Sequence, residues 1–189
     1  METVRLSSTL SSGKSFLEKV QTESQVNVRD CYQCGKCSAG CPFVEAMDYS
    51  SHKILRLLQL GQIETVLKSK SIWICSHCAT CYTRCPKKVD IPRLMEFLRM
   101  EANRQGFIGE KTVNIFSNLF LTSVRLTGRV HEMGTMGFYN LLSGHLFQDV
   151  LSAPGLFFNG KITPIPHLIK NRKVIQKIFA NTKQRQGES

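Results

Sequence analysis

The eight cysteines of this chain form two runs that share one spacing, and that spacing suits iron–sulfur chemistry. The runs are Cys31, Cys34, Cys37 and Cys41, and Cys75, Cys78, Cys81 and Cys85. In each run two residues separate the first three cysteines, three residues precede the fourth, and a proline follows it. Runs of this kind bind [4Fe-4S] clusters in two-cluster proteins. The sequence therefore predicts two [4Fe-4S] clusters as cofactors, which together use every cysteine.

The fourth cysteine of each run is expected to cross to the cluster of the other run. Three closely spaced thiolates hold three iron corners of a cubane from one loop, and the second run ligates the remaining corner. The predicted ligands are Cys31, Cys34, Cys37 and Cys85 for the first cluster, and Cys75, Cys78, Cys81 and Cys41 for the second. Two neighbouring one-electron centres of this kind predict electron transfer.

Structural zinc and disulfides explain the cysteines less well. A four-thiolate zinc site requires neither a third cysteine three residues further on nor a cysteine before a proline in both copies. Disulfides form in oxidising compartments between cysteines that are free to pair, whereas these thiols are crowded into two runs. Both alternatives are therefore disfavoured.

The histidines do not predict a second metal site. They are His52, His77, His131, His145 and His167, and no pair has the spacing of a zinc motif. His77 lies inside the second cysteine run. Its ring is expected at most to tune a cluster by a hydrogen bond to sulfur.

Charge and hydropathy predict a small basic subunit in the cytoplasm. The chain has 189 residues and a formal net charge of +11. Its apolar stretches are interrupted before they could cross a bilayer, and its N-terminus lacks the apolar segment of a secretory signal. The positive charge is expected to offset the negative clusters or to face an acidic protein partner. Nucleic acid is not expected as a partner, because no aromatic-basic stacking motif accompanies the scattered cations.

The segment between the cysteine runs is predicted to be helical, and this decides the fold class. Ser50 or Ser51 is a good N-cap, apolar residues follow at helical spacing, and Gly61 is placed to end the helix. A second short helix is expected over residues 63–68. A helical spacer argues against a β-hairpin ferredoxin. It predicts a mainly α fold, with an alpha-helical ferredoxin domain over residues 27–106 around the two clusters.

Two flanking features are expected to complete this domain. Ile72 and Trp73 are predicted to form an apolar lid beside the second cluster, where excluding water would affect the reduction potential. Asp90 as an N-cap and Pro92 in the first turn predict a helix that ends at Gly106 and closes over the clusters.

The N-terminal segment, residues 1–26, is expected to precede the cluster-binding domain. Residues 1–13 are rich in Ser and Thr and are predicted to fray. A short amphipathic helix is expected over residues 15–26.

Residues 107–180 predict an extended C-terminal docking arm. One helix is expected over residues 116–124, after which glycines and prolines break the chain into short pieces. The broken stretch contains more apolar side chains than it can bury by itself, namely Phe138, Tyr139, Leu141, Leu142, Leu146, Phe147, Leu151, Leu156, Phe157 and Phe158. A partner surface is the preferred interpretation, and an amphipathic membrane contact is the alternative. Residues 181–189 are predicted to be disordered.

The chain resembles the C-type iron–sulfur subunit of heterodisulfide reductase, from about residue 27 to residue 179. The resemblance lies in the two cysteine runs and in the stretches "HKILRLLQLG", "SIWICSHCATCYTRCP", "VDIPRLMEFLR" and "GRVHEMGTMGFYNLLSGHLF". The cysteine motifs are shared with the iron–sulfur subunits of succinate, anaerobic glycerol-3-phosphate and glycolate-oxidising enzymes. The small size and the tail are typical of the C-type subunit.

The resemblance implies an electron relay within a hetero-oligomer. In that family the C-type subunit passes single electrons between an A-type flavoprotein and a B-type subunit with CCG motifs. The B-type subunit reduces a heterodisulfide such as CoM-S-S-CoB, which is the chemistry of methanogenesis. This chain has no CCG motif and no dinucleotide-binding glycine fingerprint, so no catalytic residues are predicted in it.

Two other functions remain as alternatives. The chain could be the iron–sulfur subunit of a quinone-linked membrane dehydrogenase, for which the apolar tail would supply the membrane contact. A redox-sensing or nucleic-acid-binding iron–sulfur protein is less favoured, because eight cysteines fully ligate two clusters and leave no iron site open.

Overall fold

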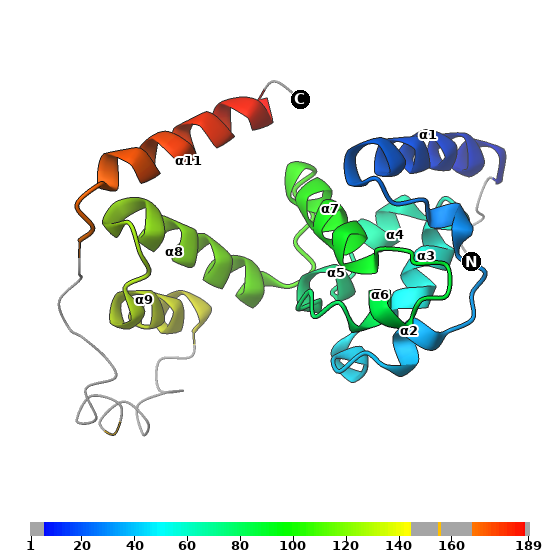
Figure 1. Cartoon of the computed structure of the whole chain (residues 1–189), viewed down its shortest axis with the longest axis horizontal. Coiled ribbons are helices and arrows are strands. Elements are labelled where there is room, and N and C mark those ends of the chain that lie inside the picture. The colour runs from blue at the N-terminus through cyan, green and yellow to red at the C-terminus, as the bar shows by residue number, and fades with distance from the viewer. Residues whose placement is uncertain (1–5, 145–154, 156–167, 188–189) are drawn as a thin grey trace. The chain divides into compact units, whose positions relative to one another are not determined.

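The described part of the chain is mainly helical, and the chain divides into two compact units. The computed structural model describes residues 6–144, 155 and 168–187, and these contain no β-strand. One unit comprises Met1–Glu110 and the other Lys111–Ser189 (Figure 1). The predicted mainly α fold is confirmed.

The core of the first unit is built by helices around the two cysteine loops. These are α1 (Leu6–Ser24), α3 (Ser51–Gln59), α4 (Ile63–Leu67), α5 (Ser71–Ile74) and α7 (Ile91–Arg104). Their fully buried side chains are Val20, Ile54, Leu55, Leu58, Val66, Leu67, Ile72, Ile91, Leu94, Met95 and Leu98. Each Leu or Ile removed from water contributes about 1.5–3 kcal/mol. This core fixes the positions from which the cysteine loops leave and return.

The two helices predicted between the cysteine runs are confirmed. Ser50 is the N-cap residue of α3, although its side chain makes no capping hydrogen bond. Gly61 follows α3 with a φ of +73°, a left-handed conformation that favours glycine. A Cβ atom at Gly13 of α1 would lie 2.7 Å from the Gly61 Cα. A side chain at position 13 would therefore prevent helix α1 from approaching the end of α3 this closely.

Helix α7 begins and ends where the sequence predicts. The Asp90 side chain accepts a hydrogen bond from the Arg93 backbone N–H at 3.1 Å, and a proline occupies the first turn. Gly106, with a φ of +76°, follows the C-cap residue. One face of α7 is buried throughout, and its residues are Ile91, Leu94, Met95, Leu98 and Ala102.

Helix α1 is longer than predicted. It begins at Leu6, so the segment expected to fray is helical from that residue on. Packing against α7 supplies the reason: the rings of Phe16 and Phe97 have centroids 6.1 Å apart, and Lys19 pairs with Glu101 at 2.9 Å. Tertiary contacts of this kind override the low helix propensity of Ser and Thr.

The second unit contains α8 (Lys111–Thr127), α9 (Glu132–Ser143) and α11 (Arg172–Gly187). Helix α8 includes the predicted helix, residues 116–124, and packs on α9. At this contact the rings of Phe116 and Tyr139 are perpendicular, with their centroids 5.8 Å apart. Helix α11 continues to Gly187, where the sequence predicted a disordered tail from residue 181. No helix in the described part of the chain is long and apolar enough to cross a membrane.

Helix α9 corrects the prediction that glycines break this region into short pieces. His131 caps α9 by accepting a hydrogen bond from the Gly134 backbone N–H at 3.1 Å. A Cβ atom at Gly134 would lie 2.6 Å from the same ring nitrogen, so glycine here makes room for the cap. The apolar residues predicted for the docking arm beyond Gly144 lie outside the described residues, as do His145 and His167.

Candidate iron-sulfur centres

The two cysteine loops begin in the same way. Cys31 is the C-cap residue of the 3-10 helix η1 (Val28–Asp30), and Cys75 is the C-cap residue of α5. The backbone N–H of Cys31 donates to the Val28 carbonyl, and that of Cys75 donates to the Ser71 carbonyl. The first cysteine of each run therefore lies directly after the last turn of a short helix, which fixes its backbone position.

The backbone then follows the same course through both loops. Gln33 and His77, two residues after the first cysteine, have φ values of +65° and +55°. Gly35 and Ala79, two residues further on, have φ values of +75° and +59°. Left-handed conformations at non-glycine residues are uncommon and are associated with functional sites. The repeated pattern shows that the shared spacing encodes a shared loop structure.

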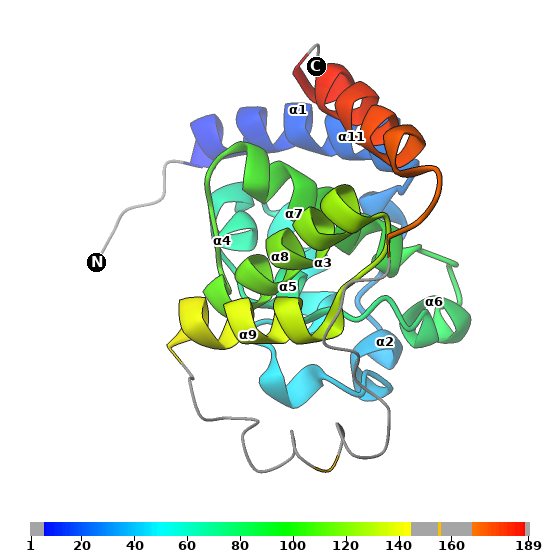
Figure 2. The ribbon, with the colours of Figure 1, turned by 90° about the vertical axis from the view of Figure 1, so that its left-hand side faces the viewer.

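Each loop ends in a short helix, and these two helices pack together. They are α2 (Lys36–Ala39) and α6 (Thr80–Arg84), which are neighbours in both views (Figure 1 and Figure 2). Gly40 follows α2, and a Cβ atom there would lie 1.9 Å from the Arg84 guanidinium. The contact brings together the chain segments that lead into Cys41 and Cys85.

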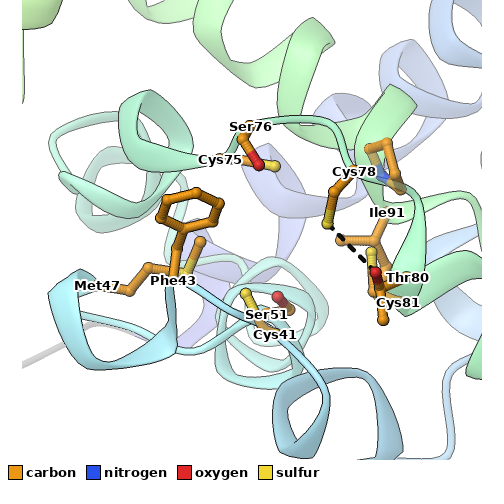
Figure 3. Close-up of a pocket in the computed structure, with 11 residues that line it drawn as sticks. Cys41, Phe43, Met47, Ser51, Cys75, Ser76, Cys78, Thr80, Cys81 and Ile91 are labelled. Atoms are coloured by element: carbon orange, nitrogen blue, oxygen red, sulfur yellow. Dashed lines mark hydrogen bonds between the residues drawn. The ribbon is translucent and has the colours of Figure 1, made fainter.

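Four cysteines line one pocket, and one of them comes from the first run. The pocket is lined by Cys41, Cys75, Cys78 and Cys81, with Phe43, Met47, Ser51, Ser76, Thr80, Ile91 and Pro92 (Figure 3). These cysteines are the four that the sequence predicts for the second cluster. The structure thus places Cys41 of the first run in the same pocket as the first three cysteines of the second run, as crossed ligation requires.

The other four cysteines also lie near one another. The Tyr32 hydroxyl has a raised pKa, first through its hydrogen bond with Cys34, and further through the nearby charges of Cys85 and Cys31. Burial raises the pKa of Cys37, and the nearby Cys31 raises it further. Cys85 of the second run is therefore placed beside the first loop.

Four of the thiols have pKa values that are shifted in different directions. Burial raises the pKa of Cys37 and of Cys75, and it raises the pKa of Cys81 to about 12. A hydrogen bond with Thr80 lowers the pKa of the exposed Cys78. Metal ligands bind as thiolates, so loading an iron–sulfur cluster would release the protons that the buried thiols hold.

The donor set fits a pair of [4Fe-4S] clusters. None of the eight cysteines forms a disulfide. Cys31 Sγ accepts a hydrogen bond from the Gln33 side-chain amide at 3.4 Å, and Cys85 Sγ accepts one from the Val89 backbone N–H at 3.3 Å. Hydrogen bonds to sulfur tune the reduction potential of clusters. Among the described residues, no three His, Cys, Asp or Glu side chains are close enough to hold a single metal ion.

The predicted role of His77 stays a prediction. Its Nε2 is buried and has no hydrogen-bond partner among the described residues. This nitrogen is therefore available for a hydrogen bond to a cluster sulfur. His52 instead bonds to the Ser38 hydroxyl at 2.7 Å.

The apolar wall of the pocket differs from the predicted lid. Phe43, Met47, Ile91 and Pro92 line the pocket, whereas Ile72 and Trp73 do not. Ile72 and Trp73 are instead buried in the core, where α5 packs against α7. The position of Phe43, two residues after Cys41, is the sequence signal that could have identified it.

Two residues that the sequence reasoning missed hold α5 at its ends. Asp48 accepts hydrogen bonds from the backbone N–H groups of Lys70 at 2.9 Å and Ser71 at 3.0 Å, and from the Ser71 hydroxyl. Burial would raise the pKa of Asp48, but these hydrogen bonds outweigh burial and lower it. Arg99 donates to carbonyls at the C-terminal end of α5. An anion at the start and a cation at the end both stabilise a helix.

Comparison with known proteins identifies the cysteine-containing segment. Residues 27–89 match the model of the 4Fe-4S dicluster domain. The C-type iron–sulfur subunit of CoB–CoM heterodisulfide reductase from Methanopyrus kandleri is 38% identical over 96 residues, which is 50% of either chain. A C-type iron–sulfur subunit of the same enzyme from Methanocaldococcus jannaschii is 41% identical over 80 residues, 42% of either chain.

A third relative has a related name. The C-type subunit of the H(2):CoB-CoM heterodisulfide,ferredoxin reductase from Methanothermobacter thermautotrophicus is 32% identical over 95 residues, 50% of this chain and 51% of the relative. The chain thus matches about half the length of these curated relatives. The resemblance to the C-type subunit of heterodisulfide reductase is confirmed over this half, and residues 27–89 are a 4Fe-4S dicluster domain.

Proposed function

We propose that this chain is the electron-transfer subunit of a heterodisulfide reductase and holds two [4Fe-4S] clusters by crossed ligation. Cys31, Cys34, Cys37 and Cys85 hold the first cluster, and Cys75, Cys78, Cys81 and Cys41 hold the second. The observation that carries the proposal is the pocket that Cys41 shares with the three cysteines of the second loop. If each run held its own cluster, Cys41 would be expected beside Cys31, Cys34 and Cys37 and not in the pocket of the second loop.

The residues of the chain supply binding and environment rather than bond chemistry. When bound, the clusters supply reversible one-electron redox chemistry. The thiolates fix each cluster in place, and the short α2–α6 contact keeps the two loops together. Phe43, Ile91 and Pro92 exclude water from one side of the second site. The amide of Gln33 and the backbone N–H of Val89 stabilise negative charge on sulfur.

We infer the partners from the relatives, which are named as the C-type subunits of CoB–CoM heterodisulfide reductases. The chain relays electrons between an A-type flavoprotein and a B-type subunit with CCG motifs. Reduction of one disulfide to two thiols takes two electrons and two protons, so two single-electron transits through this chain serve each turnover. The protons are taken up where the disulfide is cleaved, outside this chain, and the complex is expected in the cytoplasm.

Cations beside the cysteine loops support a protein partner of opposite charge. Lys36, Arg84, Lys87 and Lys88 are exposed, and none makes an ion pair with any residue in the described part of the chain. Unpaired cations around a redox site speed the encounter with an acidic surface. Charge reversal of Lys87 and Lys88 should therefore weaken recovery of the partner, whereas Lys53→Glu on α3 should leave it unchanged.

One observation favours the quinone-linked dehydrogenase as a second candidate. Helices α8 and α9 expose the large apolar side chains Phe116, Phe120, Leu121, Phe138, Leu141 and Leu142. Such residues suit a membrane surface as well as a protein partner.

Anaerobic purification of the native protein from its host separates these functions. The proposal predicts about eight irons and eight sulfides in this chain, together with a flavoprotein and a CCG-motif protein. Recovery with a membrane dehydrogenase would favour the second candidate. Recovery with nucleic acid, or with zinc in place of iron, would refute the proposal.

A further inference from the structure

The two cysteine loops are held by different side chains at the same place. For each loop, a helix further along the sequence sends one side chain back to the carbonyl of the first cysteine. Helix α3 supplies Gln59 to the first loop, and α7 supplies Arg99 to the second. The two halves of the domain therefore use a neutral donor and a cation for one structural task.

Gln59 binds the start of the first loop through its amide. Its Nε2 donates to the Cys31 carbonyl at 2.9 Å and to the Val28 carbonyl at 3.0 Å. Val28 lies three residues before the first cysteine. The Gln59 Oε1 accepts a hydrogen bond at 3.3 Å from the guanidinium of Arg56, a side chain that is exposed to solvent.

Arg99 makes the corresponding contact in the second loop. Its Nη2 donates to the Cys75 carbonyl at 2.9 Å and to the Trp73 carbonyl at 3.1 Å. Nε and Nη2 both donate to the Ile72 carbonyl, at 3.0 Å and 2.8 Å. Ile72 lies three residues before Cys75, as Val28 does before Cys31. The correspondence covers both the first cysteine and the residue three before it.

The guanidinium retains its charge beside the second site. Arg99 is only partly exposed, and it forms no ion pair with a carboxylate in the described residues. All of its described hydrogen bonds go to neutral carbonyls. An arginine stays protonated in proteins, and a charge that is shielded from water acts over a longer range.

We propose that Arg99 raises the reduction potential of the cluster held by the second run, and that the first cluster lacks such a charge at its loop carbonyls, because the neutral amide of Gln59 binds them and the nearby Arg56 is exposed to solvent. This inference rests on the ligand sets of the proposed function. Uptake of one electron makes a cluster site more negative by one charge, and no bond is broken. A fixed cation stabilises the reduced form more than the oxidised form. The same repeated loop thus yields two electrostatically different centres.

Exchanging the two donors tests the inference. Arg99→Gln places the neutral amide in the second loop, and Gln59→Arg places the cation in the first. The holo chain is titrated with dithionite as the reductant, and both clusters are followed by electron paramagnetic resonance. For Arg99→Gln, the ratio of reduced to oxidised second cluster at fixed potential should fall by about tenfold, which corresponds to about 59 mV. Gln59→Arg should raise the potential of the other cluster.

Two control variants separate charge from structure. Arg99→Lys keeps the charge but loses the planar fork, so the potential of the second cluster should stay near that of the wild type. Arg104→Gln removes a cation of the same helix that pairs with the carboxylates of Glu23 and Glu101, and should shift neither cluster. If Arg99→Gln does not retain iron, Gln59→Arg and Arg99→Lys still decide the question.

Failure of this inference is distinct from failure of the proposed function. Eight irons with unchanged potentials in both exchange variants would refute the role of Arg99 and leave the clusters in place. A shift of the same cluster by both exchanges, or an Arg99→Lys shift equal to that of Arg99→Gln, would also refute it. A wild-type chain without iron and sulfide would refute the proposed function itself.

Discussion

Glu101 of α7 pairs with Lys19 of α1, and removal of its charge should make local opening of α1 more frequent. Its side chain is only 7% exposed, and its Oε2 lies 2.9 Å from Lys19 Nζ of α1. Gln105 donates to Oε1 at 2.7 Å, and Arg104 lies 3.6 Å from Oε2. Glu101→Gln keeps the shape of the side chain but removes the charge that these donors face.

The expected cost is set by one charge-assisted hydrogen bond to a buried carboxylate. Such a bond contributes about 1.5–3 kcal/mol, and the 38% exposure of Lys19 places the estimate near the lower end, about 2 kcal/mol. Because about 1.4 kcal/mol corresponds to a factor of ten, local opening of α1 should become roughly 30-fold more frequent.

Hydrogen exchange followed by mass spectrometry measures this opening in the holo protein. Amides of α1 should exchange roughly 30-fold faster in Glu101→Gln, whereas those of α3 should be unaffected. Glu64→Gln is the matched control, because the Lys68–Glu64 pair is exposed on both sides and should contribute less than about 0.5 kcal/mol. Unchanged exchange in α1, or an equal effect of Glu64→Gln, would refute the reasoning.

Three further predictions concern the same unit. Burial would raise the pKa of Glu101, but hydrogen bonds from Lys19 and Gln105 outweigh it and lower the pKa. Its contribution to stability is therefore complete above the unfolded pKa of about 4.3 and is lost as the pH falls through the lower folded value. Protection of α1 at pH 7 and at acid pH, compared with Glu101→Gln, checks this, and identical pH profiles would contradict it. Asp48→Ala should cost about 1 kcal/mol and speed exchange at the start of α5, and unchanged exchange there would exclude the cap. Gly109→Ala should lower the thermal midpoint, because its Cβ would lie 2.5 Å from the Ser69 carbonyl oxygen; an unchanged midpoint would show that the backbone yields freely.

Local signals explain the parts of the fold that the sequence predicts correctly. Asp90 and the following proline begin α7, and Gly61 and Gly106 follow α3 and α7. The crossed cysteine sets stay a prediction from the repeated spacing; the structure places Cys41 in one pocket with Cys75, Cys78 and Cys81.

The features that escaped prediction depend on contacts between distant residues. Asp48 binds α5 across more than twenty residues, and Arg99 reaches back from α7 in the same way. Neither has a local sequence signature, because the side chain of an aspartate in a loop, like that of an arginine on a helix, is usually solvated. Gly134 suggested a chain break, but its real role is to leave room for the ring of His131.

The most direct test of the account compares single ligand substitutions in the two runs. Cys31→Ser, Cys41→Ser and Cys75→Ser are prepared without oxygen, and iron content and the magnetic resonance signals of both reduced clusters are measured. Crossed ligation predicts that Cys41→Ser alters the same cluster as Cys75→Ser and leaves intact the one that Cys31→Ser alters. If Cys41→Ser instead alters the cluster of Cys31, each run binds its own cluster and the central claim is wrong.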